Sequence, residues 1–454
     1  MKKILVIESC PGIPHTETSL ELLIKEKEVG NQVYFGLLFP SNNAWEYSMK
    51  DPRSDHKALA GLLVSNIKNL CLELDIECVL PENSEIDEVD EIYSNTIRHG
   101  KKFRNKWDLK TVVVSSVSGF THKFEPDFTI EPYKSYGKVY SDVAVRTYHN
   151  ATDLINRIKP DLIYFYAGRW ASCIPIGWAC EDSNIKYLTH ERGSNSEKYS
   201  IYNYTFLSLE ETTREIKKSA SVVDKDIVRL IGGQHFYARR NKSVSYWPSF
   251  TLNQASQNFP SDLKNIKYVA FFSSSEDEFC QTPGNKIETY FGKQFDAFEQ
   301  LKALCRELGI TLVVRVHPNI ANKHPEEEAY WAKQADNNTI VLGSKSDYDS
   351  YAILDNAHCV VTYATSVGLE AAFWGKPSVL IGNSAWYGQN GFYCPQNKDQ
   401  LADFIINAIA LDVPDFAYMY GHYFETVGYA HKYYKSEAFW SGKFLGHKLH
   451  PMPI

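Results

Sequence analysis

The stretch from Ile310 to Gly382 contains two polar turns at the ends of predicted strands, and it constrains the fold more than any other part of the chain. Its first strand, Ile310–Val316, is apolar and rich in β-branched residues, as strands buried in a parallel sheet are. The strand ends at His317-Pro318 because proline cannot continue a hydrogen-bonded ladder. A histidine is therefore expected at the carboxyl end of a buried strand.

The second predicted strand of this stretch, His358–Thr362, ends in Tyr363-Ala364-Thr365-Ser366 and leads into the helical pattern Val367–Trp374. Gly375-Lys376-Pro377 ends that helix. In an open parallel sheet the carboxyl ends of the strands form the ligand crevice, and a helix N-terminus offers unpaired N–H groups to an anion. The stretch therefore predicts half of a site for a phosphorylated ligand.

The length of 454 residues, with 44% hydrophobic residues, exceeds one ordinary domain and predicts two. An apolar strand, a polar loop and a helix follow one another both from Ile4 and from Tyr268, which is how a doubly wound α/β domain begins. The predicted domains are residues 1–245 and 262–415, with a linker near Ser243–Asp262. A helical tail, 416–454, follows, and a return of this tail to the first domain is one option.

The composition narrows the class of protein. The formal charge of −7 gives no overall basic footprint, so a nucleic-acid binder is not indicated. The nine cysteines are scattered and never spaced as CxxC, which favours a reducing cytoplasm. No apolar run approaches the ~18 residues of a membrane span. The basic and aromatic segment His431–His450 suggests peripheral contact with the inner face of the cytoplasmic membrane or with a partner, and a structural helix is the alternative.

Three further predictions concern the first half. Thr111–Ser115 reads as a strand, and Pro126–Val139 as an irregular aromatic segment. A short strand at Lys186–Leu188 runs into Thr189-His190-Glu191-Arg192-Gly193-Ser194, so polar groups again follow a strand end.

Glu191 is the main candidate for a general base in the first half. A carboxylate at a strand end, with room left by Gly193, can take the proton from an acceptor hydroxyl. The alternative is a carboxylate paired with its neighbour His190 or Arg192. His15 and Glu17, in the first loop, are competing bases.

In the second half, His317 can donate to a phosphate oxygen and offset the charge that a leaving nucleotide develops. Ser366 and Glu370 are four residues apart, so the hydroxyl can meet a phosphate while the carboxylate accepts from sugar hydroxyls. Helix capping by Ser366 and a salt-bridged Glu370 are the alternatives. The candidate ligand-binding residues of this half are Ser273, Ser274, Arg315, His317, Pro318, Thr365, Ser366, Gly368 and Glu370.

Several common motifs do not occur. There is no GxxxxGK[ST] phosphate loop and no GxGxxG after the first strand, which argues against a kinase, an ATPase or a standard dinucleotide enzyme. Asp-x-Asp occurs at Asp224 and Asp347, where neither pair directly follows an apolar strand, so both are interpreted as solvated or helix-capping. The acidic run Glu276–Glu278 reads as solvated, with Asp277 as a base or metal ligand the lesser alternative.

Two segments of the central stretch resemble the motifs of a known enzyme group. Arg315-Val316-His317-Pro318 is similar to the His-Pro motif, and Thr365–Ala371 with Gly375-Lys376-Pro377 to the serine motif, of bacterial GT-B glycosyltransferases that take sugars from CMP. Within that group the likeness is greatest to capsule-polysaccharide and Kdo-transferase-like enzymes, and the sialyltransferases are more distant. Glu191-Arg192-Gly193 looks like the E-x-G element of the same enzymes.

The resemblance implies an α/β fold of the GT-B type, with two Rossmann-like doubly wound domains facing each other across a cleft. It implies that the first domain binds the acceptor and the second the nucleotide-sugar, with His317 and Ser366 at the CMP phosphate and no cofactor or metal requirement. Glu191, His15 and His317 are the expected catalytic residues. The residues after Gly193 do not match the arginine-containing continuation of the capsule enzymes, which leaves the acceptor and the role of Glu191 open.

The function predicted is transfer of a Kdo-like or nonulosonic sugar from a CMP-sugar to a hydroxyl of a bacterial surface glycan or glycolipid. Similar motifs occur in teichoic-acid polymerases that use CDP-glycerol, so a UDP-sugar, a GDP-sugar or CDP-glycerol as donor is an alternative. A non-catalytic glycan- or nucleotide-binding subunit is the alternative from another class.

Overall fold

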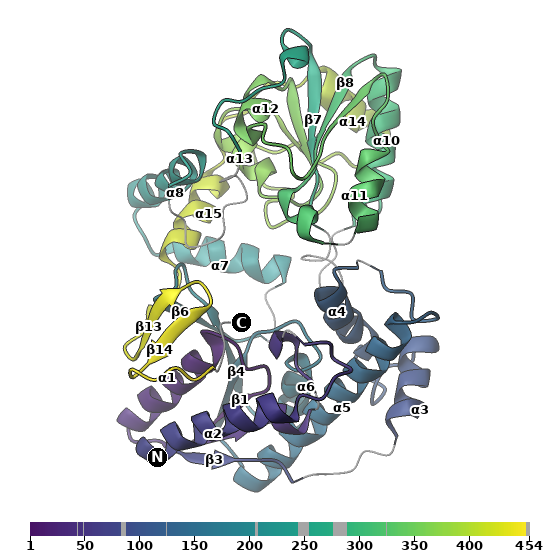
Figure 1. Ribbon diagram of the computed structural model, residues 1–454. Coiled ribbons are helices and arrows are strands. Elements are labelled where there is room, and N and C mark those ends of the chain that lie inside the picture. The colour runs from purple at the N-terminus through teal and green to yellow at the C-terminus, as the bar shows by residue number, and fades with distance from the viewer. Residues whose placement is uncertain are drawn as a thin grey trace. The chain divides into compact units, whose positions relative to one another are not determined.

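The computed structural model describes residues 1–42, 44–48, 50–82, 88–123, 125–204, 208–243, 254–275, 288–323 and 325–450. They form two compact units (Figure 1). Unit 1 comprises Met1–Ser208 and Val427–Ile454, and unit 2 comprises Leu209–Cys280 and Gly284–Thr426.

A seven-stranded sheet forms the centre of unit 1, in the order β12-β6-β5-β4-β1-β2-β3. The strands from β5 to β3 are parallel, and β6 and β12 continue the sheet in antiparallel fashion. The strands of this sheet are β1 (Lys3–Glu8), β2 (Gln32–Leu37), β3 (Glu77–Val79), β4 (Leu162–Tyr166), β5 (Tyr187–Arg192), β6 (Lys198–Tyr202) and β12 (Tyr429–Ala430). The helices of unit 1 are α1 (His15–Glu28), α2 (Lys57–Glu73), α3 (Val89–Tyr93), α4 (Leu109–Thr121), α5 (Tyr133–Ile158) and α6 (Ile174–Asp182).

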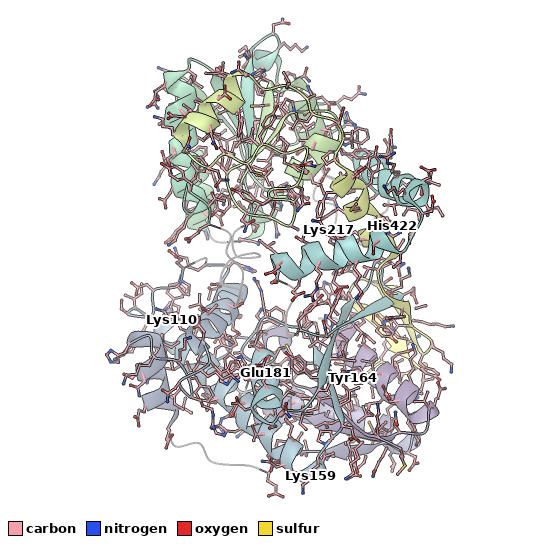
Figure 2. All side chains as sticks on the ribbon, turned by 180° about the vertical axis from the view of Figure 1, so that it is seen from behind. Lys110, Lys159, Tyr164, Glu181, Lys217 and His422 are labelled. Atoms are coloured by element: carbon pink, nitrogen blue, oxygen red, sulfur yellow. The ribbon has the colours of Figure 1, made fainter. Side chains whose placement is uncertain are left out.

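Side chains of β1 alternate between two hydrophobic cores, one on each face of the sheet. Leu5 and Ile7 pack with residues of α4, α5 and α6, whereas Ile4 and Val6 pack with residues of α1, α2 and the C-terminal segment. Tyr164 of β4 and Glu181 of α6 mark the sheet and one of its covering helices in Figure 2. Both faces of the sheet are therefore covered, as in a doubly wound fold.

Unit 2 contains a five-stranded parallel sheet in the order β11-β10-β7-β8-β9. Its strands are β7 (Tyr268–Phe272), β8 (Thr311–Arg315), β9 (Thr339–Leu342), β10 (Cys359–Thr362) and β11 (Ser378–Leu380). Its helices are α7 (Leu209–Ser221), α8 (Lys225–Arg240), α10 (Gln294–Glu307), α11 (Pro325–Ala332), α12 (Ser350–Asn356), α13 (Val367–Phe373), α14 (Lys398–Ile406) and α15 (Asp415–Thr426). Core residues of α10, α11 and α14 cover one face, and those of α12 and α13 the other.

The two sheets share one strand order. In each, the first strand of the sheet is central, the second and third follow on one side, and the fourth and fifth lie on the other side. This is the order of a Rossmann-like fold, so the predicted α/β class with two Rossmann-like doubly wound domains is confirmed. The chain order reverses between β1 and β4 in unit 1 and between β7 and β10 in unit 2, where such sheets bind ligands.

The boundary between the units differs from the predicted domains 1–245, 262–415 and 416–454. Helices α7 and α8 belong to unit 2 because they pack against α15. His422 of α15 and Lys217 of α7 lie on these neighbouring helices (Figure 2), and Ser219 Oγ is 3.5 Å from His422 Nδ1. Of the predicted linker at Ser243–Asp262, residues 244–253 lie outside the described residues, as does the acidic run Glu276–Glu278.

Two local predictions in unit 1 are wrong. Thr111–Ser115 is part of helix α4, which Asp108 caps by accepting a hydrogen bond from the Thr111 N–H, 3.1 Å. The run of valines reports burial between helices, and tertiary packing outweighs their β propensity. The segment Pro126–Val139 is not irregular throughout, because α5 begins at Tyr133.

The tail is helical only in its first part. After α15 the chain returns to unit 1, where β12 pairs with β6 and β13 (Tyr434–Ala438) forms a hairpin with β14 (Ser441–Phe444). Glu21, fully buried on α1, accepts the backbone N–H groups of Lys432 at 2.8 Å and Tyr433 at 2.9 Å. Burial acts to raise the pKa of Glu21, but the nearby His431, the hydrogen bonds from these N–H groups and Lys25 hold it at about 2. The returning segment is thus fixed to α1 by a buried carboxylate.

None of the helices among the described residues is both long enough and apolar enough to cross a membrane.

A glycine contact between α8 and α15 provides a test of the packing in unit 2. A Cβ added at Gly232 would lie 2.1 Å from the backbone oxygen of Tyr418, and one added at Gly421 would lie 2.4 Å from the backbone oxygen of Gly232. Neither backbone can move without separating the helices. We expect Gly232→Ala to lower the free energy of unfolding of unit 2 by about 2 kcal/mol or more, measured by urea unfolding.

The adjacent residue in the same helix is the control. A Cβ at Gly233 would meet Tyr418 at an ordinary van der Waals distance of 3.8 Å. Gly233→Ala should therefore be neutral or stabilise by about 0.5–1 kcal/mol through helix propensity. Equal effects of the two substitutions would contradict this description of the helix contact.

Candidate functional site

The carboxyl edge of the unit 2 sheet is held together by two serine hydroxyls. Ser273 and Ser274 directly follow the central strand β7 and are 1% exposed. Ser273 Oγ accepts the backbone N–H of His317, 2.9 Å away, and Ser274 Oγ accepts the backbone N–H of Ala364, 3.0 Å away. The turns after β8 and β10 are therefore fixed on the two sides of one serine pair, at the switch point of the sheet. Ser273 and Ser274 were predicted as ligand contacts, and the hydrogen bonds of their hydroxyls in this structure are to backbone N–H groups.

A buried amide holds the serine pair itself. Gln294, at the start of α10, has no exposed surface. Its Oε1 accepts the N–H of Ser274 at 2.6 Å, and its Nε2 donates to the Ser274 carbonyl at 3.2 Å. The role of Gln294 cannot be predicted from the sequence, because a glutamine at a helix start has no pattern that reveals these two hydrogen bonds.

His317 is half-buried, and its backbone position sets its chemistry. Pro318 starts a short 3₁₀ helix, Pro318–Asn322, and the Asn319 N–H donates to His317 Nδ1 at 3.2 Å. A neutral imidazole that accepts at Nδ1 carries its proton on Nε2. His317 can therefore act as a hydrogen-bond donor through Nε2, as the binding of a phosphate oxygen requires.

Arg315, another residue predicted to contact the ligand, is 2% exposed, and its guanidinium is hydrogen-bonded to backbone carbonyls. Its guanidinium donates to the carbonyls of Gly343 at 2.6 Å and Ser346 at 3.0 Å. Burial lowers the pKa of Arg315 to about 10. The side chain thus holds the loop after β9 against the sheet, and the described contacts give it a structural role.

The turn after β10 carries Ser366, and its hydroxyl contacts the Glu370 carboxylate, which also has other partners. Ser366 precedes α13, and its hydroxyl lies 3.4 Å from Glu370 Oε1. Glu370 is buried and also accepts from the Tyr351 hydroxyl at Oε2 and from Arg239, whose nitrogen is 3.3 Å from Oε1. Both carboxylate oxygens are therefore engaged within the protein.

Two neighbouring candidates are packed against the sheet. Thr365 is 6% exposed. A Cβ at Gly368 would lie 2.5 Å from Thr362 Oγ1 of β10, so close packing of α13 on the strand accounts for this glycine. Among the predicted residues of this turn, Ser366 is the one with substantial exposure.

The corresponding edge of unit 1 gathers three strand ends. His15 starts α1 after the loop that follows β1, Tyr166 ends β4, and Glu191 lies near the end of β5. The His15 and Tyr166 ring centroids are 3.9 Å apart, and His15 Nε2 is 3.8 Å from Glu191 Oε1. The Tyr47 hydroxyl lies 3.4 Å from the same nitrogen. Two predicted residues, His15 and Glu191, are thus neighbours at the switch point of unit 1.

Burial shapes the titration of this pair. Burial raises the pKa of Glu191, although its side chain keeps 30% of its surface exposed. Burial, followed by the charge of Arg192, lowers the pKa of His15 well below its usual value. A carboxylate with a raised pKa and partial exposure is a better proton acceptor than one in water, which suits a general base.

The alternative partners of Glu191 are otherwise engaged. His190 is fully buried, its Nε2 lies 3.0 Å from Ser19 Oγ, and burial lowers its pKa to about 3. Arg192 donates its backbone N–H to Glu191 Oε1 at 2.7 Å, but its guanidinium donates to the Ile13 carbonyl at 2.6 Å.

The returning tail contributes to this edge. The Arg192 guanidinium lies over the rings of Phe439 and Trp440, 4.5 and 4.0 Å from their centroids. Gly193 does not open a space: a Cβ there would lie 2.9 Å from the Val427 backbone oxygen, so the tail approaches at that point. No sequence pattern connects these segments.

Glu17, the other competing base, is enclosed. It is 1% exposed, its Oε1 lies 3.6 Å from His450 Nε2, and burial raises its pKa to about 8. The partly exposed Glu191 is the more accessible carboxylate of this edge.

The predicted capping role of the Asp-x-Asp pairs is confirmed in part. Asp224 caps α8 by accepting from the Asp226 N–H at 2.9 Å, and Asp349 caps α12 by accepting from the Tyr351 N–H at 3.0 Å.

Comparisons with known proteins give distant structural similarity. KpsC of Thermosulfurimonas dismutans, described as a beta Kdo 2,4 transferase, matches with a TM-score of 0.38 and 10% identity over 58% of this chain and 79% of its own. UDP-GlcNAc 2-epimerase of Methanocaldococcus jannaschii matches with a TM-score of 0.29 and 8% identity over 90% and 92% of the two chains. MurG of Acinetobacter baumannii gives 0.29 and 10% over 94% and 95%.

No family model and no curated protein matches the sequence. At these TM-scores the similarities add nothing to the fold assignment, which rests on the strand orders of the two sheets.

Proposed function

We propose that this protein is a glycosyltransferase that moves a Kdo-like or nonulosonic sugar from a CMP-sugar to a hydroxyl group of a bacterial surface glycan or glycolipid. The observation that carries the proposal is the serine pair Ser273–Ser274, which holds the turns of His317 and Ser366 beside the switch point of unit 2. Ligands of doubly wound sheets bind at that point. The motif resemblance of the same two turns supports CMP as the nucleotide.

Unit 2 supplies hydrogen-bond donors for the leaving group. When the bond between the anomeric carbon and the phosphate oxygen breaks, the electron pair stays on that oxygen and CMP gains negative charge. The Nε2–H of His317 donates to the phosphate and stabilises this charge. The single O–H of Ser366, which faces Glu370 Oε1 at 3.4 Å without ligand, turns to the phosphate when the donor binds. The proposal includes no metal ion, as the family resemblance implies.

Unit 1 supplies the base. As the acceptor oxygen bonds to the anomeric carbon, its proton passes to the Glu191 carboxylate. His15 is the alternative base, but burial lowers its pKa, which makes the neutral ring a weaker proton acceptor than an ordinary histidine.

The His317→Ala variant tests the leaving-group role. Loss of one donor to the developing charge should lower kcat by about 10²–10³-fold, measured as release of CMP from CMP-Kdo in the presence of acceptor. His358→Ala is the matched control, because His358 precedes β10 at the opposite end of the sheet and bonds to the Ile405 carbonyl at 2.8 Å. Turnover near the wild-type rate in both variants would contradict the proposed role of His317.

The Glu191→Gln variant tests the base. The wild-type rate should rise with pH through the raised pKa of Glu191, since only the deprotonated carboxylate accepts a proton. In the variant the rate should fall by about 10²–10⁴-fold, and the rising limb should disappear while CMP binding is unchanged. An unaltered pH profile would assign the proton to another group.

A panel of nucleotides tests the donor. A ligand that binds the folded state at one hundred times its Kd adds about 2.7 kcal/mol of stability. CMP should raise the thermal midpoint more than UMP, GMP or CDP at equal concentration. A larger shift with UMP or GMP would favour a UDP- or GDP-sugar, and CDP would favour CDP-glycerol. CMP binding without turnover of any tested donor would favour a non-catalytic subunit.

A further inference from the structure

Arg239 of helix α8 and Ser366 of the turn after β10 contact the same carboxylate, that of Glu370. Arg239 Nη2 lies 3.3 Å from Glu370 Oε1, and the Ser366 hydroxyl lies 3.4 Å from the same oxygen. Two groups that contact one oxygen atom at these distances cannot be farther apart than the sum of the two distances. The guanidinium of Arg239 is therefore a neighbour of the hydroxyl to which phosphate binding is assigned above.

Arg239 has donors beyond the one that Glu370 uses. A guanidinium carries five N–H groups in a planar fork, which matches the oxygen atoms of a phosphate. The Arg239 side chain is 37% exposed, whereas that of Glu370 is 7% exposed. Arg239 is thus the more exposed partner of this pair, and Glu370 is the more deeply buried one.

Glu370 does not depend on Arg239 alone for its hydrogen bonds. The Tyr351 hydroxyl donates to Oε2, and the Ser366 hydroxyl reaches Oε1. A carboxylate held in this way can orient Ser366 and Arg239 together. This arrangement differs from the predicted role in which Glu370 itself accepts from sugar hydroxyls.

The next residue in the helix shows the contrasting case. Arg240 pairs with Asp355 and lies over the rings of Trp374 and Tyr351, 4.6 and 5.2 Å from their centroids. These contacts join α8 to helix α12, which carries Tyr351 and Asp355, and to Trp374 at the end of α13. Arg240 therefore offers a cation of similar exposure, 30%, whose partner carboxylate is Asp355 and not Glu370.

We propose that Arg239 binds the phosphate group of the nucleotide donor, and that Glu370 is a positioning residue that orients Arg239 and Ser366 toward it. The inference rests on the proposed function and adds a cationic contact to it. As the sugar–oxygen bond breaks and the electron pair remains on the phosphate, a guanidinium beside that phosphate stabilises the added charge.

The test compares the binding of CMP and of cytidine to the full chain by isothermal titration calorimetry. Cytidine lacks the phosphate, so it reports on contacts to the nucleoside alone. We expect Arg239→Met to weaken CMP binding by about ten- to hundredfold and to leave cytidine binding unchanged. Arg239→Lys, which retains the charge without the fork, should recover part of the CMP affinity.

Arg240→Met is the matched control and should leave the ratio of CMP to cytidine affinity at the wild-type value. If Arg239→Met also keeps that ratio while the wild type binds CMP more tightly than cytidine, the inference fails and the proposed function stands. If the wild type does not bind CMP, the CMP-dependent function fails and this inference with it. Should Arg239→Met not fold, the ratio for the charge-conserving Arg239→Lys decides, because loss of the fork should still lower it.

Discussion

Two backbone N–H groups accepted by two buried serine hydroxyls organise the functional edge of unit 2. Leaving a buried N–H without an acceptor costs about 1–3 kcal/mol, so the His317 and Ala364 amides fix their turns to Ser273 and Ser274. Gln294 in turn fixes Ser274 by two hydrogen bonds to its backbone. With the backbone held in this way, the His317 ring and the Ser366 hydroxyl need only side-chain rotation to meet a ligand. Such preorganisation is what electrostatic stabilisation of a leaving group requires, since donors that must first reorient lose part of their effect.

In unit 1, the loops at the carboxyl edge of the sheet are held in place by the last part of the chain. Glu21 accepts two backbone N–H groups of the returning segment, and this contact fixes the tail to α1. The tail then brings Phe439 and Trp440 over the Arg192 guanidinium, which donates to the Ile13 carbonyl just before His15. The loop that carries His15 is therefore supported by residues far away in the sequence. The buried carboxylate stays ionised because its hydrogen bonds outweigh the effect of burial on its pKa.

The elements of unit 2 were predictable because their signals are local. An apolar run followed by His317-Pro318, and another followed by hydroxyl residues and a helical pattern, define where strands β8 and β10 end. The strand predicted at Thr111–Ser115 failed because a run of valines reports burial and does not by itself distinguish a buried helix from a strand. The partners of the site residues were not predictable, since they come from distant segments. The acceptors of Arg315 lie in the loop after β9, and Arg239 reaches Glu370 from a helix that precedes the whole sheet.

Under the proposed function, the two units use one strand order for opposite electrostatic tasks. A general base needs few hydrogen-bond donors around its carboxylate, because each donor to the ionised form lowers its pKa. In the Glu191 carboxyl, burial raises the pKa and outweighs the donors beside it, among them the Arg192 backbone N–H at 2.7 Å. A phosphate site needs the reverse, a concentration of donors, which the turns of His317 and Ser366 supply together with Arg239. A single sheet edge that combined both sets would weaken the base with the donors meant for the phosphate. Placing them on separate copies of one fold avoids that conflict, and it explains why similar strand ends carry such different residues.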